Sequence, residues 1–516
     1  MKRFLFASIM GFIAFSAICQ DVSIEWKSTY TYDQPTDKSS LIYSTADGNE
    51  FYMLRQPASI SDPLIWIDKY SCSGGSTYTK SLPGNEGTFT ENVLFEKILV
   101  AKDQFLLFFR GWSKDAKKSS WLVRSFTLDG EYTKEAKELD SHTSQNKLKA
   151  GDYNVAVTPD GSMFVLLMTF PFEKGEKEKI RIKGFDAVNL TEKWSKDITM
   201  DIESEKGTYN EIAVDDQANV YIVKRIAEGK EFKFHLYILE SSAAALKEVA
   251  MDIPQGTIID QWRLVMTPAS NLYFTGLYSV KSSVMVDGSF CIKINTSNQQ
   301  IDLCKFNPFT DRVASEKSSG LTDMKLKDIM FAPSGSFYII AEEKKESISS
   351  KTDPSGRIIY DSELQSNKVV LMCYKSTGIR DWEATISKNQ NFHAAERYPA
   401  LRWDSYIAGF AGDKFCILYN NLNLSDTWKE MDGATCYRSH FEQARYYPFM
   451  FVVEPNGNIK YGDKIYGLPL FKFYHDVNIG HAALIPGFAV SSPTGLVIMC
   501  GTSDVKQVQL GKVTVK

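Results

Sequence analysis

The sequence predicts an all-β fold, an eight-bladed β-propeller of four-stranded antiparallel blades in which the N-terminal strand completes the last blade and closes the ring. Three observations lead to this prediction. A short hairpin recurs along the chain, each copy is followed by a second hairpin, and the incomplete last unit has a spare strand at the opposite end of the chain. The 516 residues, 43% of them hydrophobic, are enough for such a ring.

The recurring hairpin consists of an apolar strand, a tight polar turn and a second apolar or aromatic strand, as in VAVTPDGSMFVLL, IAVDDQANVYIV and IMFAPSGSFYII. Asp-Gly, Pro-Ser-Gly and Ala-Ser-Asn suit these turns because such residues tolerate positive φ. The turns centre near residues 47, 103, 160, 216, 270, 334, 412 and 494. Both strands are almost continuously apolar, which is expected of strands packed on both faces.

A second hairpin follows each of the first seven, for example IRIKGFDAVNLTEKWSKDI and LMCYKSTGIRDWEATI. Its strands alternate between apolar and charged residues, as outer strands should. Two hairpins make a four-stranded unit, whose strands we call A to D from the centre outwards. Such units at this spacing are typical of propeller blades.

The eighth unit lacks its D strand, because only VQLGKVTVK follows GLVIMCG before the chain ends. The N-terminal segment DVSIEWKSTY has the spacing of a D strand, since Trp26 lies 21 residues before Asp47 and Trp194 lies 22 before Asp216. We expect SIEWKS to pair with GKVTVK, which would remove exposed sheet edges. Trp26 is then a packing residue, like Trp194 and Trp382.

The expected domain is therefore a single propeller over residues 20–516. Its blades 1–7 occupy about 38–466, the outer strand of blade 8 is 21–30, and the rest of blade 8 occupies about 481–516.

The segments TPDGSMFVL and DDQANVYIV resemble the D-x-x-G-N-h-Y-h elements of secreted bacterial β-propellers, a repeat architecture of the WD40-like or SBBP-like kind. The resemblance covers essentially the whole chain after residue 19. It implies the architecture and no single activity, because this scaffold carries many functions. The Trp-Asp ending of WD40 repeats and the Ser-x-Asp-x-Gly-x-Thr-Trp boxes of sialidases are absent from the sequence.

Residues 1–19 have the pattern of a secretory signal peptide, with Lys2 and Arg3 before an uncharged apolar run that ends in Ala17-Ile18-Cys19. We therefore expect export to the periplasm, the medium or the cell surface. Acylation of Cys19 is the alternative, although Ile18 is bulky where lipoprotein sites want a small residue. No other stretch reaches the roughly 18–20 apolar residues of a membrane span.

Seven cysteines follow the expected leader. Cys291 and Cys304 are equidistant from the turn at Ser297-Asn298, so they would face each other on two strands paired symmetrically. Export permits a disulfide between them, and two half-buried thiols are the alternative.

Charge and motifs exclude several classes of function. The formal net charge is −4 and no basic stripe occurs, which disfavours a nucleic-acid partner. The sequence has no P-loop, dinucleotide-binding, zinc-protease or nucleophile-elbow motif. Asp215–Asn219 lacks the glycine of a calcium loop and fits a hairpin turn better. We therefore expect no cofactor and no metal.

The units depart from their own pattern in blades 6 to 8. The segments 342–367 and 421–446 lengthen the B–C connections, and the D–A connections into blades 7 and 8 are also long. B–C and D–A loops emerge on one face of a propeller, and long loops on a rigid scaffold are where binding sites concentrate. Histidines, arginines and aromatic residues gather there, and we take these as candidate binding residues: His393, Arg397, Trp403, Arg438, His440, Arg445, Tyr446 and His475.

Two functions fit this face. The first is a non-catalytic scaffold that binds a protein or a polysaccharide. The second is a polysaccharide lyase, in which Arg397 or Arg438 would neutralise a uronate, His393 or His440 would abstract a proton, and Tyr446 would protonate the leaving oxygen. The absence of catalytic motifs favours the scaffold.

Polar and aromatic residues also occur at the starts of A strands, namely Tyr153-Asn154, Tyr209-Asn210, Trp262 and Lys327. They could line the mouth of the central channel or satisfy the local backbone, and we favour the second role.

Overall fold

A computed structural model describes most of the chain in segments. These are residues 22–31, 38–45, 49–56, 65–71, 75–82, 93–133, 136–144, 151–229, 231–280, 285–310, 313, 321–352, 354–356, 358–395, 405–422, 434–436, 446–464, 483–501 and 507–515.

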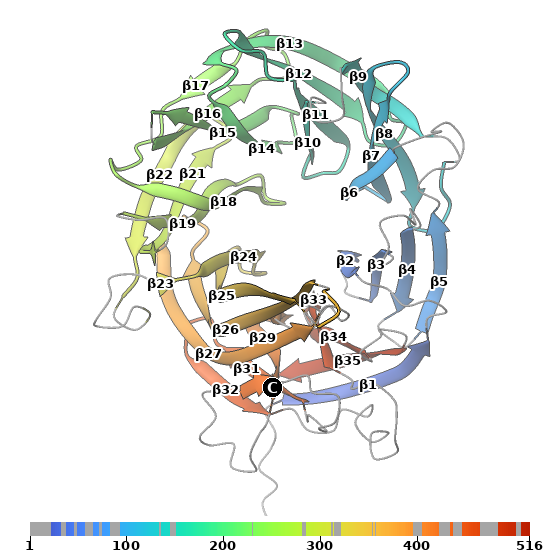
Figure 1. Ribbon diagram of the computed structural model, residues 1–516, viewed down its shortest axis with the longest axis vertical. Coiled ribbons are helices and arrows are strands. Elements are labelled where there is room, and N and C mark those ends of the chain that lie inside the picture. The colour runs from blue at the N-terminus through green and yellow to red at the C-terminus, as the bar shows by residue number, and fades with distance from the viewer. Residues whose placement is uncertain are drawn as a thin grey trace, which may run out of the picture.

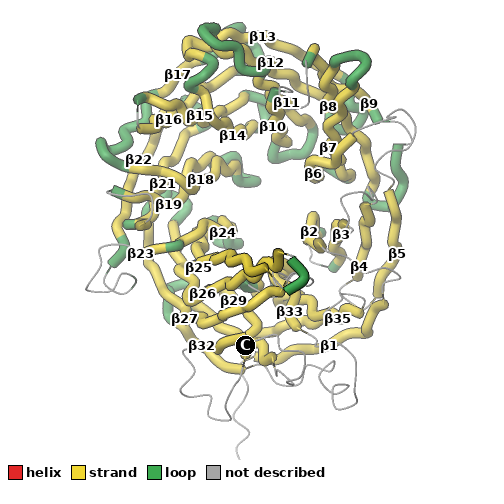
Figure 2. Tube along the Cα trace, viewed as in Figure 1, coloured by secondary structure: helices red, strands yellow, loops and turns green. Residues whose placement is uncertain are grey.

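The chain forms small antiparallel sheets that stand around a common centre (Figure 1). In the described segments the regular elements are strands, joined by turns and loops (Figure 2). Five sheets have four strands, one has five and one has eight, and a two-stranded ribbon accompanies them. In the separate sheets the first strand lies innermost and the last lies outermost (Figure 1). The predicted all-β propeller architecture is therefore confirmed.

Six sheets are separate blades. The first three contain β2 Lys38–Ser44, β3 Glu50–Gln56, β4 Ile65–Ser71 and β5 Gly75–Leu82; β6 Val93–Ala101, β7 Gln104–Ser113, β8 Lys118–Thr127 and β9 Lys137–Thr143; and β10 Asp152–Val157, β11 Met163–Thr169, β12 Lys177–Asp186 and β13 Glu192–Glu203.

The next three blades follow the same order, and the last of them gains a fifth strand. They contain β14 Gly207–Val214, β15 Val220–Glu228, β16 Glu231–Leu239 and β17 Lys247–Val249; β18 Ile258–Met266, β19 Leu272–Ser279, β21 Gly288–Asn295 and β22 Gln300–Pro308; and β24 Met324–Phe331, β25 Phe337–Thr352, β26 Ile358–Tyr374, β27 Arg380–Ala395 and β30 Ala434–Cys436. The ribbon pairs β20 Met285–Val286 with β23 Leu321–Thr322.

The remaining strands form one eight-stranded sheet. Its order is β1 Val22–Thr31, β35 Gln507–Val515, β34 Gly495–Gly501, β33 Ala483–Ser492, β28 Ile407–Ala411, β29 Lys414–Leu422, β31 Tyr446–Val453 and β32 Ile459–Lys464.

The expected count of eight blades is wrong, because the described residues form six separate blades and one larger sheet. The strands expected to form blades 7 and 8 are joined into one sheet where their inner strands meet, through a parallel bridge between Ala411 and Ser492. The Gly412 amide donates to the Ser492 carbonyl at 3.0 Å, and the Phe410 amide donates to Ser491 Oγ at 2.8 Å. These backbone contacts merge two units that the repeat pattern separates.

The N-terminal strand β1 pairs antiparallel with β35, as the spacing predicts, from Val22 opposite Val515 to Thr31 opposite Gln507. Trp26 lies opposite Gly511, where a Cβ atom would sit 2.7 Å from the indole ring. In the third blade Trp194 covers Gly184 of the neighbouring strand in the same way. Trp26 is thus a packing residue at the position of an outer-strand tryptophan.

The hairpin turns also follow the prediction. Those expected near 103, 160, 216, 270, 334, 412 and 494 each join two antiparallel strands, and several contain a residue with positive φ, including Lys102, Gly161, Ala218, Ser270, Gly335 and Gly412. The turn expected near residue 47 lies outside the described residues, although β2 and β3 do pair.

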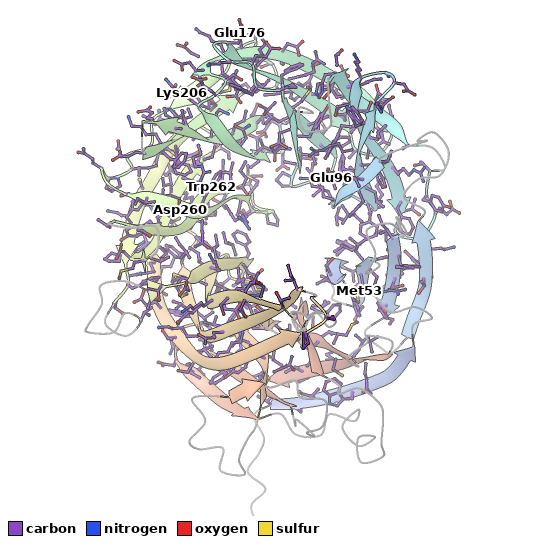
Figure 3. All side chains as sticks on the ribbon, in the orientation of Figure 1. Met53, Glu96, Glu176, Lys206, Asp260 and Trp262 are labelled. Atoms are coloured by element: carbon purple, nitrogen blue, oxygen red, sulfur yellow. The ribbon has the colours of Figure 1, made fainter. Side chains whose placement is uncertain are left out.

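Apolar clusters between neighbouring sheets form the core. One cluster joins Val165 and Ile182 of the third blade to Val214 and Ile222 of the fourth. Another joins the first blade to the eight-stranded sheet, where the rings of Phe51 and Phe488 lie 5.3 Å apart. Each fully buried side chain of this size contributes about 1.5–3 kcal/mol. Packing on both faces explains why the inner strands are almost wholly apolar. Side chains fill the space between sheets (Figure 3).

Side chains of one blade also donate hydrogen bonds to the outer turn of the next. The hydroxyls of Tyr52 and Tyr78 donate to the Leu128 carbonyl, at 3.1 and 3.0 Å. The same kind of bond recurs along the ring: Tyr221 Oη to the Thr296 carbonyl, Tyr273 Oη to the Ser376 carbonyl and Trp382 Nε1 to the Pro455 carbonyl. These bonds fix neighbouring sheets against each other.

The sixth blade corrects one expectation about loops. Most of the segment 342–367, expected to be a loop, extends strands β25 and β26, which pair from Lys344 opposite Ser366 to Thr352 opposite Ile358. The β-branched residues and the Asp-Pro-Ser-Gly turn of this segment favour a long hairpin over an open loop.

Candidate binding site

The structure places the predicted site residues only in part. His393 lies in β27 with its backbone opposite Glu363, and Tyr446 begins β31 opposite Leu422. The other six lie outside the described residues: Arg397, Trp403, Arg438, His440, Arg445 and His475. The binding face of blades 6 to 8 therefore stays a prediction.

The disulfide considered between Cys291 and Cys304 is not formed, and both thiols are free. A bulge at Asp302 shifts the pairing by one residue, so Cys291 lies opposite Lys305 and Cys304 lies opposite Ile292. Because successive side chains of a strand point to opposite faces, the two sulfurs are on different sides of the sheet. Cys291 is buried in the core, whereas Cys304 is half-buried.

The polar and aromatic residues expected to satisfy the backbone at the starts of the inner strands contact other side chains instead. The Tyr153 ring stacks on Trp121, with the centroids 4.9 Å apart. Asn210 accepts a hydrogen bond from Lys224 at 2.9 Å, and Lys327 forms an ion pair with Glu342 at 3.2 Å. Trp262 is buried in the core.

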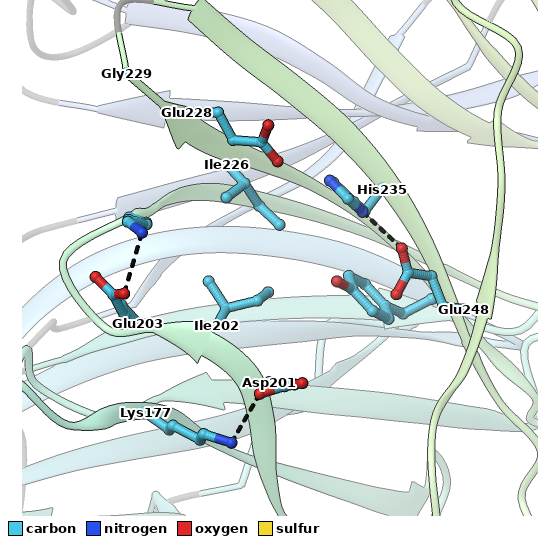
Figure 4. A pocket seen from close by; sticks show the side chains of 11 residues that line it. Lys177, Asp201, Ile202, Glu203, Ile226, Glu228, Gly229, His235 and Glu248 are labelled. Carbon is cyan, nitrogen blue, oxygen red and sulfur yellow. Dashed lines mark hydrogen bonds and ion pairs between the residues drawn. The ribbon is translucent and has the colours of Figure 1, made fainter.

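A polar pocket of about 630 Å³ opens between the outer parts of the third and fourth blades (Figure 4). Its walls come from β12, β13, β15, β16 and β17, from the connection between β13 and β14, and from the turn between β15 and β16. The lining residues are Lys177, Asp201, Ile202, Glu203, Lys206, Ile226, Glu228, Gly229, His235, Tyr237 and Glu248. We call this set the acidic pocket, since it contains four carboxylates and two lysines.

Three of the four pocket carboxylates form ion pairs with lysine side chains. Lys177 contacts Asp201 at 2.7 Å, Lys206 contacts Glu203 at 3.1 Å, and Lys233 contacts Glu228 at 2.5 Å. The hydrogen bond from Lys177 lowers the pKa of Asp201, and that from Lys233 lowers the pKa of Glu228. Asp201 and Glu228 are thus ionised at neutral pH.

His235 and Glu248 form the inner wall of the acidic pocket. His235 Nδ1 lies 2.7 Å from a Glu248 carboxylate oxygen, and the imidazole stacks on Tyr237 at 6.1 Å between centroids. Burial raises the pKa of Tyr237 to about 12, so its hydroxyl stays protonated. His235 Nε2 is shielded from solvent. Its position is poor for proton transfer to a ligand in the pocket.

The acidic pocket can offer carboxylate acceptors, a tyrosine and two isoleucine side chains to a ligand. In the part of the chain that the structure describes, no three His, Cys, Asp or Glu side chains lie where they could together hold a metal ion. Among the same residues, no helix has the length and hydrophobicity needed to cross a membrane.

The amino-acid sequence does not indicate this pocket. Lys177 lies in the run EKGEKEK, which has the composition of a solvated hairpin tip, and the other charges come from short connections of ordinary length. One signal was present, since Pro254 and Gly256 come directly after the expected outer strand of the fourth blade and limit its length.

No family model matches the chain, and no curated protein matches it. Solved structures share the general architecture. The WD40 domain of SCAP from fission yeast is 9% identical, with a TM-score of 0.41, over 96% of this chain and 95% of that chain. The Dos1 propeller is 10% identical, with a TM-score of 0.44, over 95% of each chain.

The polysaccharide lyase Uly1 is 8% identical, with a TM-score of 0.35, over 93% of this chain and 100% of that chain. At such identities the likeness concerns the fold alone. The chain is a β-propeller, because its sheets are arranged radially with the A strands innermost. The comparisons show the fold and no particular family.

Proposed function

We propose that this protein is a binding propeller without catalytic activity, which holds a protein or glycan on the face where the B–C and D–A loops emerge. The observation that carries the proposal is the acidic pocket, which is bounded by the B–C turn of the fourth blade and by the D–A connection that precedes it. Its volume of about 630 Å³ falls within the roughly 300–1,000 Å³ of ligand sites.

The pocket suits binding because its lining residues lie on paired strands or on the short connections between them. Exposed ion pairs with Lys177 and Lys206 neutralise part of its negative charge. The excess of carboxylates over lysines favours a ligand with cationic groups or hydroxyl donors. The shielded His235 Nε2 supports binding over acid–base chemistry at this position.

The loops of blades 6 to 8 extend the proposed face. Six candidate residues come from these segments of the sequence, and His393 and Tyr446 lie on the adjoining strands β27 and β31. The six are Arg397, Trp403, Arg438, His440, Arg445 and His475, and the residue types of all eight suit sugars and acidic groups. We also propose that residues 1–19 direct export of a single domain over 20–516. In that domain, pairing of β1 with β35 closes the ring and completes the last unit.

Binding can be tested by screening the exported chain against glycan and peptide arrays and against a mixture of uronate-containing polysaccharides. We expect retention of a ligand, and at least a tenfold loss of affinity when Glu203→Gln and Glu248→Gln are combined. Glu131→Gln, an exposed carboxylate of the second blade, is the matched control and should bind normally. Release of an unsaturated sugar product would overturn the non-catalytic proposal.

A further inference from the structure

We propose that the fourth blade binds an extended peptide segment of a partner protein as an added β-strand along Glu231–His235 of β16. The segment alternates basic and apolar side chains. This inference rests on the proposed binding function and names the class of partner.

The outer strand of the fourth blade leaves part of β16 uncovered. β17 has three residues and pairs only with Leu236, Tyr237 and Ile238. In contrast, β13 of the third blade has 12 residues and β22 of the fifth has nine. Among the described residues, no strand pairs with the outer side of Glu231–His235. Met251, Ile253 and Pro254, which follow β17 in the chain, line a cavity together with this edge, so an added strand would lie between them and β16.

The uncovered edge separates two pockets. Side chains of successive residues point to opposite faces of a strand. His235 and Tyr237 face the third blade and line the acidic pocket, whereas Phe234 and Leu236 belong to the core cluster shared with the fifth blade. A strand added beside β16 would therefore have one face toward each pocket.

The second pocket, on the side of the fifth blade, has a volume of about 560 Å³. Its walls combine polar and apolar residues. The polar ones include Glu231, Lys233, His235, Glu248, Gln255 and Thr257, and the large apolar ones are Phe232, Phe234, Val249, Met251, Ile253 and Pro254. Phe232 is 44% exposed although it lies in a strand, and the Arg225 guanidinium covers its ring at 4.4 Å. We call the part of this cavity lined by the six apolar residues the apolar pocket. An exposed aromatic residue beside an unpaired edge is a feature expected of a peptide-binding groove.

The charge of the acidic pocket indicates which residues the peptide should have on the face toward that pocket. The acidic pocket contains four carboxylates and two lysines, and Glu231 is exposed at the start of the same edge. Lysine or arginine at every second position would meet these carboxylates, while the intervening apolar residues would enter the apolar pocket. Backbone pairing would supply the rest of the recognition, as in other cases of strand addition.

The test uses the full exported chain and a fluorescent peptide, acetyl-Lys-Leu-Lys-Leu-Lys-Leu-Lys-amide, with binding followed by fluorescence anisotropy. We expect saturable binding that weakens at least tenfold for a peptide of the same composition with lysines and leucines in separate blocks. Phe232→Ala and Glu248→Gln should each weaken binding at least fivefold. Phe172→Ala, which removes an aromatic ring exposed on the third blade, and Glu131→Gln should not.

Two peptides with methylated backbone amides then show whether binding needs backbone hydrogen bonds to β16 or only contacts of the peptide side chains. One carries methyl groups on the lysine amides and the other on the leucine amides, so only one of them loses the N–H groups that face β16. We expect one peptide to lose binding and the other to keep it. Equal binding of both would overturn strand addition and leave the binding function intact.

Two further outcomes would also overturn the inference. If the alternating peptide does not bind while another ligand binds and is lost in Glu203→Gln/Glu248→Gln, the proposed function stands and the peptide class is wrong. If sedimentation shows a dimer that Phe232→Ala disrupts, the occupant of the edge is a second copy.

Discussion

We expect the stability of the folded protein to depend on pH through Glu211, a largely buried carboxyl group on an inner strand. It lies on β14, and its carboxylate accepts a hydrogen bond from the Leu264 amide of β18 at 2.9 Å. Burial raises the pKa of Glu211 from its ordinary value of 4.5 to about 7, although the Leu264 amide, Arg263 and Lys97 oppose the shift. The folded protein therefore prefers the protonated carboxyl.

The sign of the effect follows from this raised pKa. The contribution of a group whose folded pKa is raised is fully present below the unfolded pKa and is lost as the pH rises through the folded pKa. Glu211 thus destabilises the fold progressively from pH about 4.5 to about 7. One pKa unit corresponds to about 1.4 kcal/mol, so the full effect is about 3 kcal/mol.

Glu211→Gln keeps the shape of the protonated side chain and an oxygen that can accept the hydrogen bond from the Leu264 amide. It removes the group that gains or loses a proton. We expect the variant to match the wild type at about pH 4 and to exceed its free energy of unfolding by about 3 kcal/mol at about pH 8. Urea denaturation followed by tryptophan fluorescence at several pH values measures the difference.

Glu131→Gln, at an exposed position, is the control and should show no such trend. A difference between Glu211→Gln and the wild type that does not change with pH would refute the reasoning. So would a wild type that is the more stable protein at pH 8.

Three other predictions follow from the packing. Removal of residues 22–31 should lower the midpoint of thermal unfolding, because it uncovers the edge of β35 and part of a core cluster; an unchanged midpoint would contradict ring closure by β1. Gly511→Ala should cost about 1–3 kcal/mol in urea denaturation, since the new methyl group meets the Trp26 ring, and Trp26→Leu should relieve part of that cost. Maleimide labelling of the native protein with peptide mapping should modify Cys304 before Cys291, whose pKa burial raises strongly, whereas recovery of a Cys291–Cys304 disulfide would contradict the observed register.

The hairpins could be predicted from the sequence because their signals are local. Turn residues that tolerate positive φ stand between apolar strands at Gly161, Ala218 and Gly335, and the structure has hairpins there. The position of Trp26 could be predicted because outer-strand tryptophans share a spacing to the next turn.

The register between paired strands and the residues at which strands end could not be predicted, because both depend on contacts between segments and the repeat pattern does not show them. A single bulged residue, Asp302, separates Cys291 from Cys304 although their spacing about the turn is symmetrical. In the sixth blade, residues expected to form a loop continue β25 and β26, because those strands find partners along their whole length. The acidic pocket is made from unremarkable charged residues that approach only when two blades pack together.

The all-β propeller architecture, the hairpin positions and the pairing of the first strand with the last could be predicted because all three depend on periodicity along the chain. The sharing of one sheet by two expected units, through the bridge from Ala411 to Ser492, could not be predicted in this way. The same is true of the end of β17 at Val249, beyond which no described strand pairs with the outer side of β16. The bridge joins backbone groups of two different units, and the pattern of side chains along the chain contains no information about such a contact.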